Sequence, residues 1–418
     1  MEKQKKYKLA TLGCRTNQYE SEAYAAQLRA LGYEEAQGEE KADICIVNTC
    51  TITEEADRSS RYQVRLLARH HPGSKLLVTG CLADRLPEEI RKMEGVSHVV
   101  ANQEKEKLLN LLFLEEELPE FAIDAFGGHT RAFVKVQDGC NSFCTYCIVP
   151  YVRGRSRSRP IEEIVTEIKI LIKNGYKEVV LTGINIGDFD GGEGSPHRLA
   201  DLVRAVDQIE GLERLRLSSI DPMQVDAPLQ EALMSGKKTC HSMHLVLQSG
   251  SNVILKRMNR QYTRQQFLDT VERFRKFSSD FTFTTDIIVG FPGETKQDFE
   301  ETLEIMKQVQ FAKVHMFPYS PRKRTRAALY PNQLSQEVIE ERKQLVLRTA
   351  EQMTFELRQN YVGKTMQVLL EGKEQDYFSS HSDNFLRVLV KGEGLKSNQL
   401  IPVHCIENQP EGLIAHAN

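Results

Sequence analysis

Three cysteines stand within eight residues of this chain, Cys140, Cys144 and Cys147, in the spacing Cys-x3-Cys-x2-Cys. Thiols this close cannot all pair with one another as disulfides, but their thiolates can point into one small volume and hold iron or zinc. An iron–sulfur cube usually takes four cysteines, so three leave one iron open to another ligand. An open position is typical of catalytic metal sites. The spacing alone leaves a structural zinc site, completed by a distant Cys or His, as the alternative.

Composition narrows the class of protein. A length of 418 residues favours two or three domains, and 27% charged residues is ordinary for a globular chain. No apolar run approaches the roughly 18 residues of a membrane span, and the charged start has no signal-peptide core. We therefore expect a cytoplasmic protein with no membrane partner, whose nine cysteines are metal ligands or core thiols. A net charge of −3 requires any nucleic acid to be bound by local basic patches.

The first 120 residues alternate between strand and helix. Strands are expected at 8–12, 43–50, 75–81 and 98–100, and helices at 19–31 and 54–70. Continuous apolar strands between helices predict a parallel α/β sandwich. Cys14, Cys50 and Cys81 each lie just past the end of a separate strand, at the edge where open α/β sheets bind ligands. We expect these three to converge on a metal, with three unrelated buried thiols as the alternative. Cys45, in mid-strand, is expected to be a core thiol.

Two further regions follow an acidic, turn-like linker at 115–130. Strands are expected at 131–137, 177–183, 214–219, 242–248, 282–289 and 311–317, with helices near 161–174, 198–209, 226–234, 263–277, 295–308 and 334–358. This alternation predicts an incomplete parallel (β/α)6 barrel, whose active site lies at the carboxyl ends of the strands, where the Cys140 loop begins. Short strands at 366–371, 385–390 and 399–403 predict a small antiparallel barrel at the end of the chain.

The Cys-x3-Cys-x2-Cys loop resembles that of the radical S-adenosylmethionine (SAM) superfamily. With the upstream trio and with Val-Pro-Tyr-Val-Arg-Gly at 149–154, the resemblance narrows to the methylthiotransferases. The segments 11–22 and 47–57 are most like the bacterial branch that acts on threonylcarbamoyladenosine in tRNA. At the first of these, this chain reads Gly-Cys-Arg-Thr-Asn. The isopentenyladenosine branch usually reads Gly-Cys-Gln-Met-Asn there, and the ribosomal-protein branch Gly-Cys-Pro-Lys-Asn.

The resemblance implies three domains and two iron–sulfur clusters. The domains are an N-terminal methylthiotransferase domain at 1–120, a radical-SAM partial barrel at 126–356, and a TRAM-like RNA-binding β-barrel at 359–418. It implies that Cys140, Cys144 and Cys147 hold a [4Fe–4S] cluster that binds SAM. It also implies that Cys14, Cys50 and Cys81 hold an auxiliary [4Fe–4S] cluster.

The resemblance also implies the reaction: insertion of a methylthio group at C2 of N6-threonylcarbamoyladenosine at position 37 of tRNA, with two SAM per turnover. One SAM gives a 5′-deoxyadenosyl radical, the auxiliary cluster presents sulfur, and a second SAM provides the methyl group. The implied partners are the tRNA anticodon stem-loop, an electron donor and a sulfur source. The alternatives are the same chemistry on isopentenyladenosine or on a ribosomal-protein aspartate, and a non-catalytic iron–sulfur or zinc RNA-binding protein.

Further site residues are expected at the strand ends and in two basic runs. The expected SAM contacts are Tyr146, Gly183, Asn185, Ser219, Gln248, Ser249, Asp286 and Gly290. Ordinary turn chemistry is the alternative for each. The expected RNA phosphate contacts are Arg153, Arg155, Arg157, Arg322, Lys323 and Arg324. A solvated charged face is the alternative there. Phe385 keeps a ring able to stack on a base.

Overall fold

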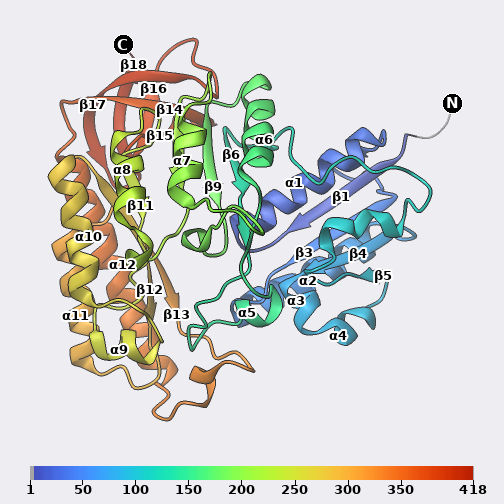
Figure 1. Ribbon diagram of the computed structural model, residues 1–418, viewed down its shortest axis with the longest axis horizontal. Helices are drawn as coiled ribbons and strands as arrows, with labels where there is room; N and C mark the ends of the chain where they lie inside the picture. Colours follow the sequence, from blue (N-terminus) through green and yellow to red (C-terminus); the bar gives the residue numbers. More distant parts are fainter. Residues whose placement is uncertain (1–3, 418) are drawn as a thin grey trace.

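The computed structural model describes residues 4–417, and its N-terminal part is a parallel sheet (Figure 1). The strands are β1 (Lys6–Thr11), β2 (Glu34–Glu35), β3 (Ile44–Thr49), β4 (Lys75–Gly80) and β5 (Val96–Val99), in the order β2-β1-β3-β4-β5. Every neighbouring pair is parallel. Short helices α3 (Cys81–Arg85), α4 (Pro87–Arg91) and η1 (Lys105–Leu111) complete this part. The expectation of a parallel α/β sheet is confirmed.

Helices cover both faces of this sheet. Helix α1 (Arg15–Ala30) packs through Tyr24 and Leu28 over Ile44 and Ile46 of β3. Helix α2 (Glu54–His70) covers the opposite face. Because successive strand residues point to opposite faces, both sets of β3 side chains are buried, which is why the strand is apolar throughout. Cys45 is fully buried on the α2 face and is a core thiol, as expected.

The central part is an open parallel barrel in two sets of three strands. The first set is β6 (Arg131–Lys135), β9 (Glu178–Thr182) and β10 (Arg214–Leu217), and the second is β11 (Ser242–His244), β12 (Thr282–Val289) and β13 (Lys313–Pro318). Isolated parallel bridges, such as Ile220 to Leu245, join the two sets. The longer helices are α6 (Ile161–Lys173), α7 (Leu199–Asp207), α8 (Ala227–Ser235), α10 (Arg264–Phe277), α11 (Lys296–Val309) and α12 (Gln336–Gln359). They cover the outer face of the strands (Figure 1), so the incomplete barrel is confirmed.

Short elements decorate the ends of these strands. They are the two-strand hairpin β7 (Gln137–Asp138) and β8 (Arg157–Ser158), the helices α5 (Val149–Val152) and α9 (Asn252–Arg257), and the 3-10 turns η2 (Ile186–Asp188), η3 (Pro222–Gln224) and η4 (Arg326–Leu329). The segment expected to be a linker forms no helix or strand over 115–130. It is nevertheless packed: Ile123 and Phe126 are buried in the barrel core, and Phe121 contacts the rings of Tyr19 and Tyr24. The sheet and the barrel therefore share an apolar interface.

The last part is a closed five-stranded barrel. Its strands are β14 (Thr365–Glu374), β15 (Tyr377–Ser382), β16 (Arg387–Lys391), β17 (Leu400–Gln409) and β18 (Gly412–Ala417), in the order β14-β15-β16-β18-β17. Four of the pairs are antiparallel, and β16 with β18 is parallel. Closure leaves no unpaired edge, which stabilises so small a sheet. The sequence pattern indicated three of these strands and missed β15 and β18.

The small barrel closes the amino-terminal end of the central barrel. Arg214 of β10 donates to the carbonyl oxygens of Gln367 and His381, at 2.6 and 3.0 Å. Arg216 donates to those of Ser382 and Asp383, at 2.6 and 2.7 Å. The Cys140 loop follows β6 at the other end of the strands. The small barrel therefore lies at the amino-terminal end of the central barrel, and the Cys140 loop lies at its carboxyl end (Figure 1). Within residues 4–417, no helix combines the length and the apolar character that a membrane crossing needs.

Candidate functional site: two thiol triads around one pocket

The Cys140–Cys147 loop is fixed on both sides by hydrogen bonds. Before it, Gln137 Nε2 donates to the carbonyl of Gly139 at 2.8 Å, while its Oε1 accepts the N–H of Asn185 at 2.9 Å. After it, Asn259 Nδ2 donates to the carbonyls of Ser142 and Phe143, both at 3.2 Å. These bonds come from β7 and from the segment after α9, so two separate parts of the barrel set the conformation of the loop.

The three thiols of the loop have the surroundings of metal ligands. Arg260 Nη1 donates to Cys144 Sγ at 3.0 Å, and the N–H of Ser142 donates to Cys140 Sγ at 3.4 Å. Burial, with nearby Cys144, raises the pKa of Cys147 to about 12. Burial also raises the pKa of the Cys140 thiol. A thiol with a raised pKa keeps its proton until a metal replaces it, which argues against Cys140 or Cys147 as a free nucleophile.

The second triad lies at the carboxyl edge of the N-terminal sheet. Cys14, Cys50 and Cys81 follow β1, β3 and β4, which are neighbours in the sheet with β3 in the middle. Gly13 has a φ of +94°, and a Cβ there would stand 2.9 Å from Cys50 Sγ, so the turn before Cys14 lies directly against Cys50. Burial, with Cys81 and Cys14 adding to it, raises the pKa of Cys50 to about 12. Gly80, also at positive φ, leaves no space for a side chain beside the backbone of Thr49.

The two triads share a wall. Cys81 packs against Ile148 and Val152, which belong to the short α5 turn immediately after Cys147. Arg153 ends that turn with only 1% of its surface exposed. Its guanidinium lies 3.1 Å from Glu20 and 2.8 Å from Asp138. Helix α1 and the barrel loop are therefore held together by this buried arginine.

Arg153 is the centre of a larger buried charge network. Lys105 also pairs with Glu20 and Asp138, and Lys135 lies 3.8 Å from Glu20. Burial alone would raise the pKa of Glu20, but Arg153, Lys105 and Lys135 outweigh it and hold that pKa at about 2. The carboxylate is therefore ionised at neutral pH, and each cation of the network already has a partner.

Two of the arginines expected to bind RNA are buried instead, which corrects the prediction for them. Arg153 is enclosed as described, and Arg322 is 6% exposed and pairs with Asp57 at 2.8 Å. Arg157 is exposed but also forms an ion pair, 3.2 Å from Asp138. Arg155, Lys323 and Arg324 are exposed and have no ion pair among residues 4–417. The two basic runs are thus divided between structural and accessible charges.

A pocket of about 190 Å³ lies between the Cys140 loop and the loop after Cys50. It is lined by Ile52, Thr53, Tyr146, Cys147, Ile148, Gln248, Asp286, Ile288, Phe317, Pro318, Tyr319 and Ser320. The lining thus comes from the loop after Cys50, from the Cys140 loop and from the inner faces of the central strands. Gln248 has a φ of +63°, and its buried Oε1 has no hydrogen-bond partner among the described residues. A buried acceptor left open in this way fits a polar ligand.

The eight residues expected to contact SAM fall into three groups. Tyr146, Gln248 and Asp286 line the pocket. Asn185 lies beside the thiol loop, where its Nδ2 donates to Ser142 Oγ at 3.3 Å. Gly183 is in the same place, since a Cβ there would stand 2.9 Å from Gln137 Oε1.

Ser219, Ser249 and Gly290 are not among the residues that line the pocket, and their contact with SAM stays a prediction. Ser249 is fully buried, and its hydroxyl accepts the N–H of Ser251 at 3.2 Å. The N–H of Gly290 donates to Glu294 at 2.8 Å in a tight turn. Both belong to the turn chemistry that was the alternative.

Sequence reasoning missed Gln137, Asn259 and Arg260. Each acts on the thiol loop through a side chain, and each stands in an ordinary polar segment. Asn259 and Arg260 are more than a hundred residues from the loop that they contact. Gln137 carried the only usable signal, its place at the end of the strand that leads into the loop.

The residues present fit an iron–sulfur cube better than a single zinc ion. Within the described part of the chain, no three His, Cys, Asp or Glu side chains stand close enough to hold one metal ion. A structural zinc needs four ligands around one atom, whereas a cube takes each thiolate on a different iron. The Cys140 loop offers three thiols beside a pocket with the open acceptor of Gln248. That donor set fits a [4Fe–4S] cluster with one iron free for SAM.

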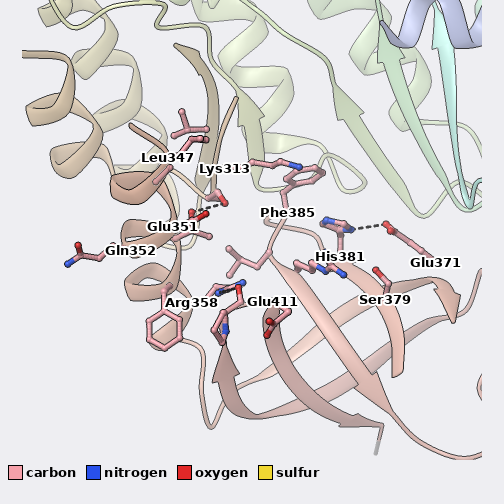
Figure 2. Close-up of a pocket in the computed structure, with 18 residues that line it drawn as sticks. Lys313, Leu347, Glu351, Gln352, Arg358, Glu371, Ser379, His381, Phe385 and Glu411 are labelled. Carbon is pink, nitrogen blue, oxygen red and sulfur yellow. Dashed lines mark hydrogen bonds and ion pairs between the residues drawn. The ribbon is translucent and has the colours of Figure 1, made fainter. Parts of the chain in front are cut away.

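A larger cavity, of about 940 Å³, lies away from both triads, between α12, the start of β13 and the small barrel (Figure 2). His381 and Glu371 pair across its floor at 2.8 Å. Phe385 stacks on His381 with the ring centroids 4.9 Å apart, and the guanidinium of Arg216 lies 5.3 Å from the Phe385 centroid. The ring therefore packs toward the base of the central barrel, and its ability to stack on a base stays a prediction.

Comparisons with known proteins agree with this arrangement. The "Radical SAM superfamily" matches residues 134–306, and the "Uncharacterized protein family UPF0004" matches residues 6–101. The chain is 48% identical over 411 residues to the threonylcarbamoyladenosine tRNA methylthiotransferase MtaB of Chlamydia pneumoniae, covering 98% of this chain and 97% of that one. It is 37% identical to the MtaB of Bacillus subtilis, covering 91% and 89%. It is 35% identical to the tRNA-2-methylthio-N(6)-dimethylallyladenosine synthase of Desulforamulus reducens, covering 98% and 95%.

Solved structures show the same fold at low identity. The radical SAM methyltransferase TsrM from Kitasatospora setae, with cobalamin and a [4Fe–4S] cluster bound, superposes with a TM-score of 0.55 at 12% identity, over 76% of this chain and 74% of that one. The fold and the thiol loop define a radical SAM enzyme. The full-length relatives narrow the class, and the chain belongs to the radical SAM methylthiotransferase family.

Proposed function

We propose that this enzyme inserts a methylthio group at C2 of N6-threonylcarbamoyladenosine at position 37 of tRNA, in the cytoplasm, with two SAM per turnover. The observation that carries the proposal is the pair of thiol triads that meet at one wall of one pocket. A hydrogen-abstracting centre and a sulfur-donating centre must both reach the same base, and a shared wall meets that need. The names of the two MtaB relatives support the choice of base.

Each triad has its own part in the proposal. Cys140, Cys144 and Cys147 hold the [4Fe–4S] cluster that binds SAM, and Cys14, Cys50 and Cys81 hold the auxiliary [4Fe–4S] cluster. When bound, the first cluster supplies the electron that cleaves SAM, and the second supplies sulfur. An electron donor and a sulfur source must therefore act with this chain.

The pocket residues position SAM and exclude water. Arg260, 3.0 Å from Cys144 Sγ, stabilises negative charge on that thiolate. Gln248 and Asp286 offer oxygen acceptors to the polar groups of SAM. Ile288 and Phe317 form an apolar wall, which limits the access of water to a reactive species.

The outer surface of the Cys140 loop and of α5, here called the rim, supports binding of the tRNA anticodon stem-loop. Phe143 and Tyr151 meet edge to face with their centroids 6.2 Å apart. The guanidinium of Arg155 lies 4.4 Å from the Phe143 centroid, and that of Arg324 lies 5.3 Å from the Tyr151 centroid. Arginine charges and aromatic rings in alternation suit phosphates and unstacked bases together. We assign the parts of the chain accordingly: 1–120 carries the auxiliary cluster, 126–356 carries the SAM site, and 359–418 forms a TRAM-like domain.

Nucleoside analysis of tRNA tests the proposal. A deletion strain is expected to lose 2-methylthio-threonylcarbamoyladenosine and to accumulate threonylcarbamoyladenosine, measured by tandem mass spectrometry. The Cys144→Ala variant should fail to restore the nucleoside, whereas the wild-type gene should restore it. Persistence of the methylthio nucleoside in a strain with no second enzyme able to make it would show that the substrate is another one. Anaerobic reconstitution should give about eight irons and eight sulfides per chain, the content of two cubes.

A further inference from the structure

A second, smaller cavity lies inside the central barrel, between the pocket and the terminal barrel. It is lined in part by Arg15, Arg131, His244, Thr284, His315 and Phe385, and its volume is about 30 Å³. A space of that size holds roughly two waters, because one water needs about 10–15 Å³ on this measure. It therefore has room for a carboxylate and no room for a base or a nucleotide.

The small cavity continues the pocket along the inner faces of two paired strands. On β12, Thr284 lines the small cavity and Asp286 lines the pocket. On β13, His315 lines the small cavity and Phe317 lines the pocket. Residues two apart on a strand are about 6.5 Å apart on the same face. A group of four or five bonds that extends from a base held beside SAM at the edge of the pocket therefore reaches the small cavity.

Positive charge is in excess around the small cavity. Arg131 pairs with Glu371 at 3.1 Å, and Arg216 pairs with Glu178 at 2.6 Å. Arg15 is different: within residues 4–417 its guanidinium makes no hydrogen bond and no ion pair. It lies 5.1 Å from the centroid of the Phe133 ring, so only a cation–π contact holds it.

The nearest acidic groups, Asp286 and Glu178, attract the guanidinium of Arg15 but make no ion pair with it among residues 4–417. Asp286 lies 3.3 Å from His244 Nε2, and Glu178 pairs with Arg216. Burial lowers the pKa of His315 to about 4, so that ring is neutral at neutral pH. Lys313, at the start of β13, adds a further positive charge on the same side, and it too has no ion pair in the described chain. Arg15 is half-buried, and a guanidinium whose five donors have no protein partner is suited to bind an anion.

We propose that Arg15 binds the carboxylate of the threonylcarbamoyl group, and that this contact selects the modified base. The inference rests on the proposed function, because only that substrate brings a carboxylate on the amino group of the adenine. Arg15 directly follows Cys14, so one turn of the chain carries both an auxiliary thiol and the side chain that binds the substrate. Arginine binds a carboxylate through two parallel hydrogen bonds, which fixes direction as well as charge. An uncharged isopentenyl group would leave the guanidinium without a partner.

Three anticodon stem-loops of one sequence test the inference. The first carries threonylcarbamoyladenosine, the second carries the same group with its carboxylate replaced by a carboxamide, and the third carries isopentenyladenosine. The full-length reconstituted enzyme is assayed as wild type, Arg15→Gln and Arg15→Lys. Arg58→Gln is the matched control, because Arg58 is 68% exposed on α2 and pairs only with Glu55 of the same helix. The measurements are the Kd of each stem-loop, the kcat and KM for the methylthio product, and the Kd of SAM.

The wild type should prefer the acid to the amide by about 30-fold or more in Kd and KM, because the amide leaves the guanidinium of Arg15 without its ionic partner. Arg15→Gln should bind acid and amide equally and should process the amide as the wild type does. Arg15→Lys keeps the positive charge but cannot form two parallel hydrogen bonds, so it should retain a smaller preference for the acid over the amide. Arg58→Gln should match the wild type, and the Kd of SAM should be the same in all four proteins.

The outcomes separate this inference from the proposed function. A wild type that methylthiolates the isopentenyl stem-loop and ignores the acid would overturn both. A wild type that prefers the acid, with the full preference kept in Arg15→Gln, would overturn the Arg15 assignment alone. A loss of SAM affinity in Arg15→Gln equal to its loss of acid affinity would assign the guanidinium to the carboxylate of SAM, and would also overturn the inference. If Arg15→Gln does not fold, Arg15→Lys decides by the same comparison of acid and amide.

Discussion

The two thiol triads are built in opposite ways. Cys140, Cys144 and Cys147 come from one loop, which its own strand and the segment after α9 hold by hydrogen bonds. Cys14, Cys50 and Cys81 come from three strand ends, and they approach one another only because the sheet is parallel and Gly13 leaves room beside Cys50. The first ligand set is a local property of the chain, whereas the second is a property of the sheet. Their contact at α5 makes one site of them.

This difference predicts which of the two thiol triads a given substitution should affect. A change in the loop should affect one centre, a change at the sheet edge the other, and a change in α5 both. The outer rim should influence RNA binding without altering either centre. The four predictions below follow this order, from the largest expected effect to the smallest.

Removal of one thiol from each triad gives the sharpest separation. Cys144→Ala should abolish the reductive cleavage of SAM, measured as 5′-deoxyadenosine under dithionite. Cys50→Ala should keep that cleavage and lose the methylthio product, because the proposed function assigns its thiol to the sulfur-supplying centre. Equal loss of cleavage in the two variants would show that the triads are not separate in function.

Arg153→Met should destabilise the protein and disturb both triads. The substitution leaves Glu20 and Asp138 buried without their main partner, which typically costs about 3–5 kcal/mol of unfolding free energy. Chemical denaturation measures this cost, and the iron content should fall by more than the four atoms of one cube. Arg155→Met is the control, because Arg155 is exposed, and it should change stability by no more than about 0.5 kcal/mol. If Arg153→Met changed neither the unfolding free energy nor the iron content, the contact at α5 would not be what joins the two centres.

Arg260→Met should affect the loop triad alone. It removes the donor to Cys144 Sγ, and loss of such a partner of a metal ligand typically lowers affinity or activity by about 10- to 100-fold. The rate of SAM cleavage should fall by about that factor, and the reduction potential of the loop cluster should become more negative. Arg264→Met, which alters an ion pair on the outer face of α10, should change neither quantity. An unchanged potential in Arg260→Met would contradict the contact to the thiolate.

Arg324→Gln should weaken RNA binding by a small amount. The exposed guanidinium at Tyr151 is expected to contact one phosphate, so the slope of log Kd against log salt should decrease by about one. The iron content and RNA-free SAM cleavage should be unchanged. Lys276→Gln, on the outer face of α10, should leave the salt slope as in the wild type. An equal effect of both substitutions would place RNA binding elsewhere than at this rim.

Much of the fold followed from local rules. Helix α2 begins and ends where the sequence predicted, because Thr53 caps it, acidic residues occupy its first turn and Pro72 follows its end. The buried strands were recognised by their apolar runs. Strand β15 was missed because Ser379, Ser380 and Ser382 give it no hydrophobic alternation, although it closes the small barrel. The two thiol triads were proposed from the sequence because their spacing and their strand-end positions are visible in a single chain.

The sequence by itself determined the order of the elements, the loop triad and the family, since each depends on neighbouring residues. Only the tertiary structure decided which charges are free. Arg153 and Arg155 are two residues apart and alike in sequence, yet Arg153 is buried against Glu20, which lies 133 residues upstream. Phe385 turned toward the barrel base and Arg15 toward its interior for the same reason. The chemical type of a charged or aromatic side chain can be read from the sequence, but the group that it contacts depends on how distant segments fold together.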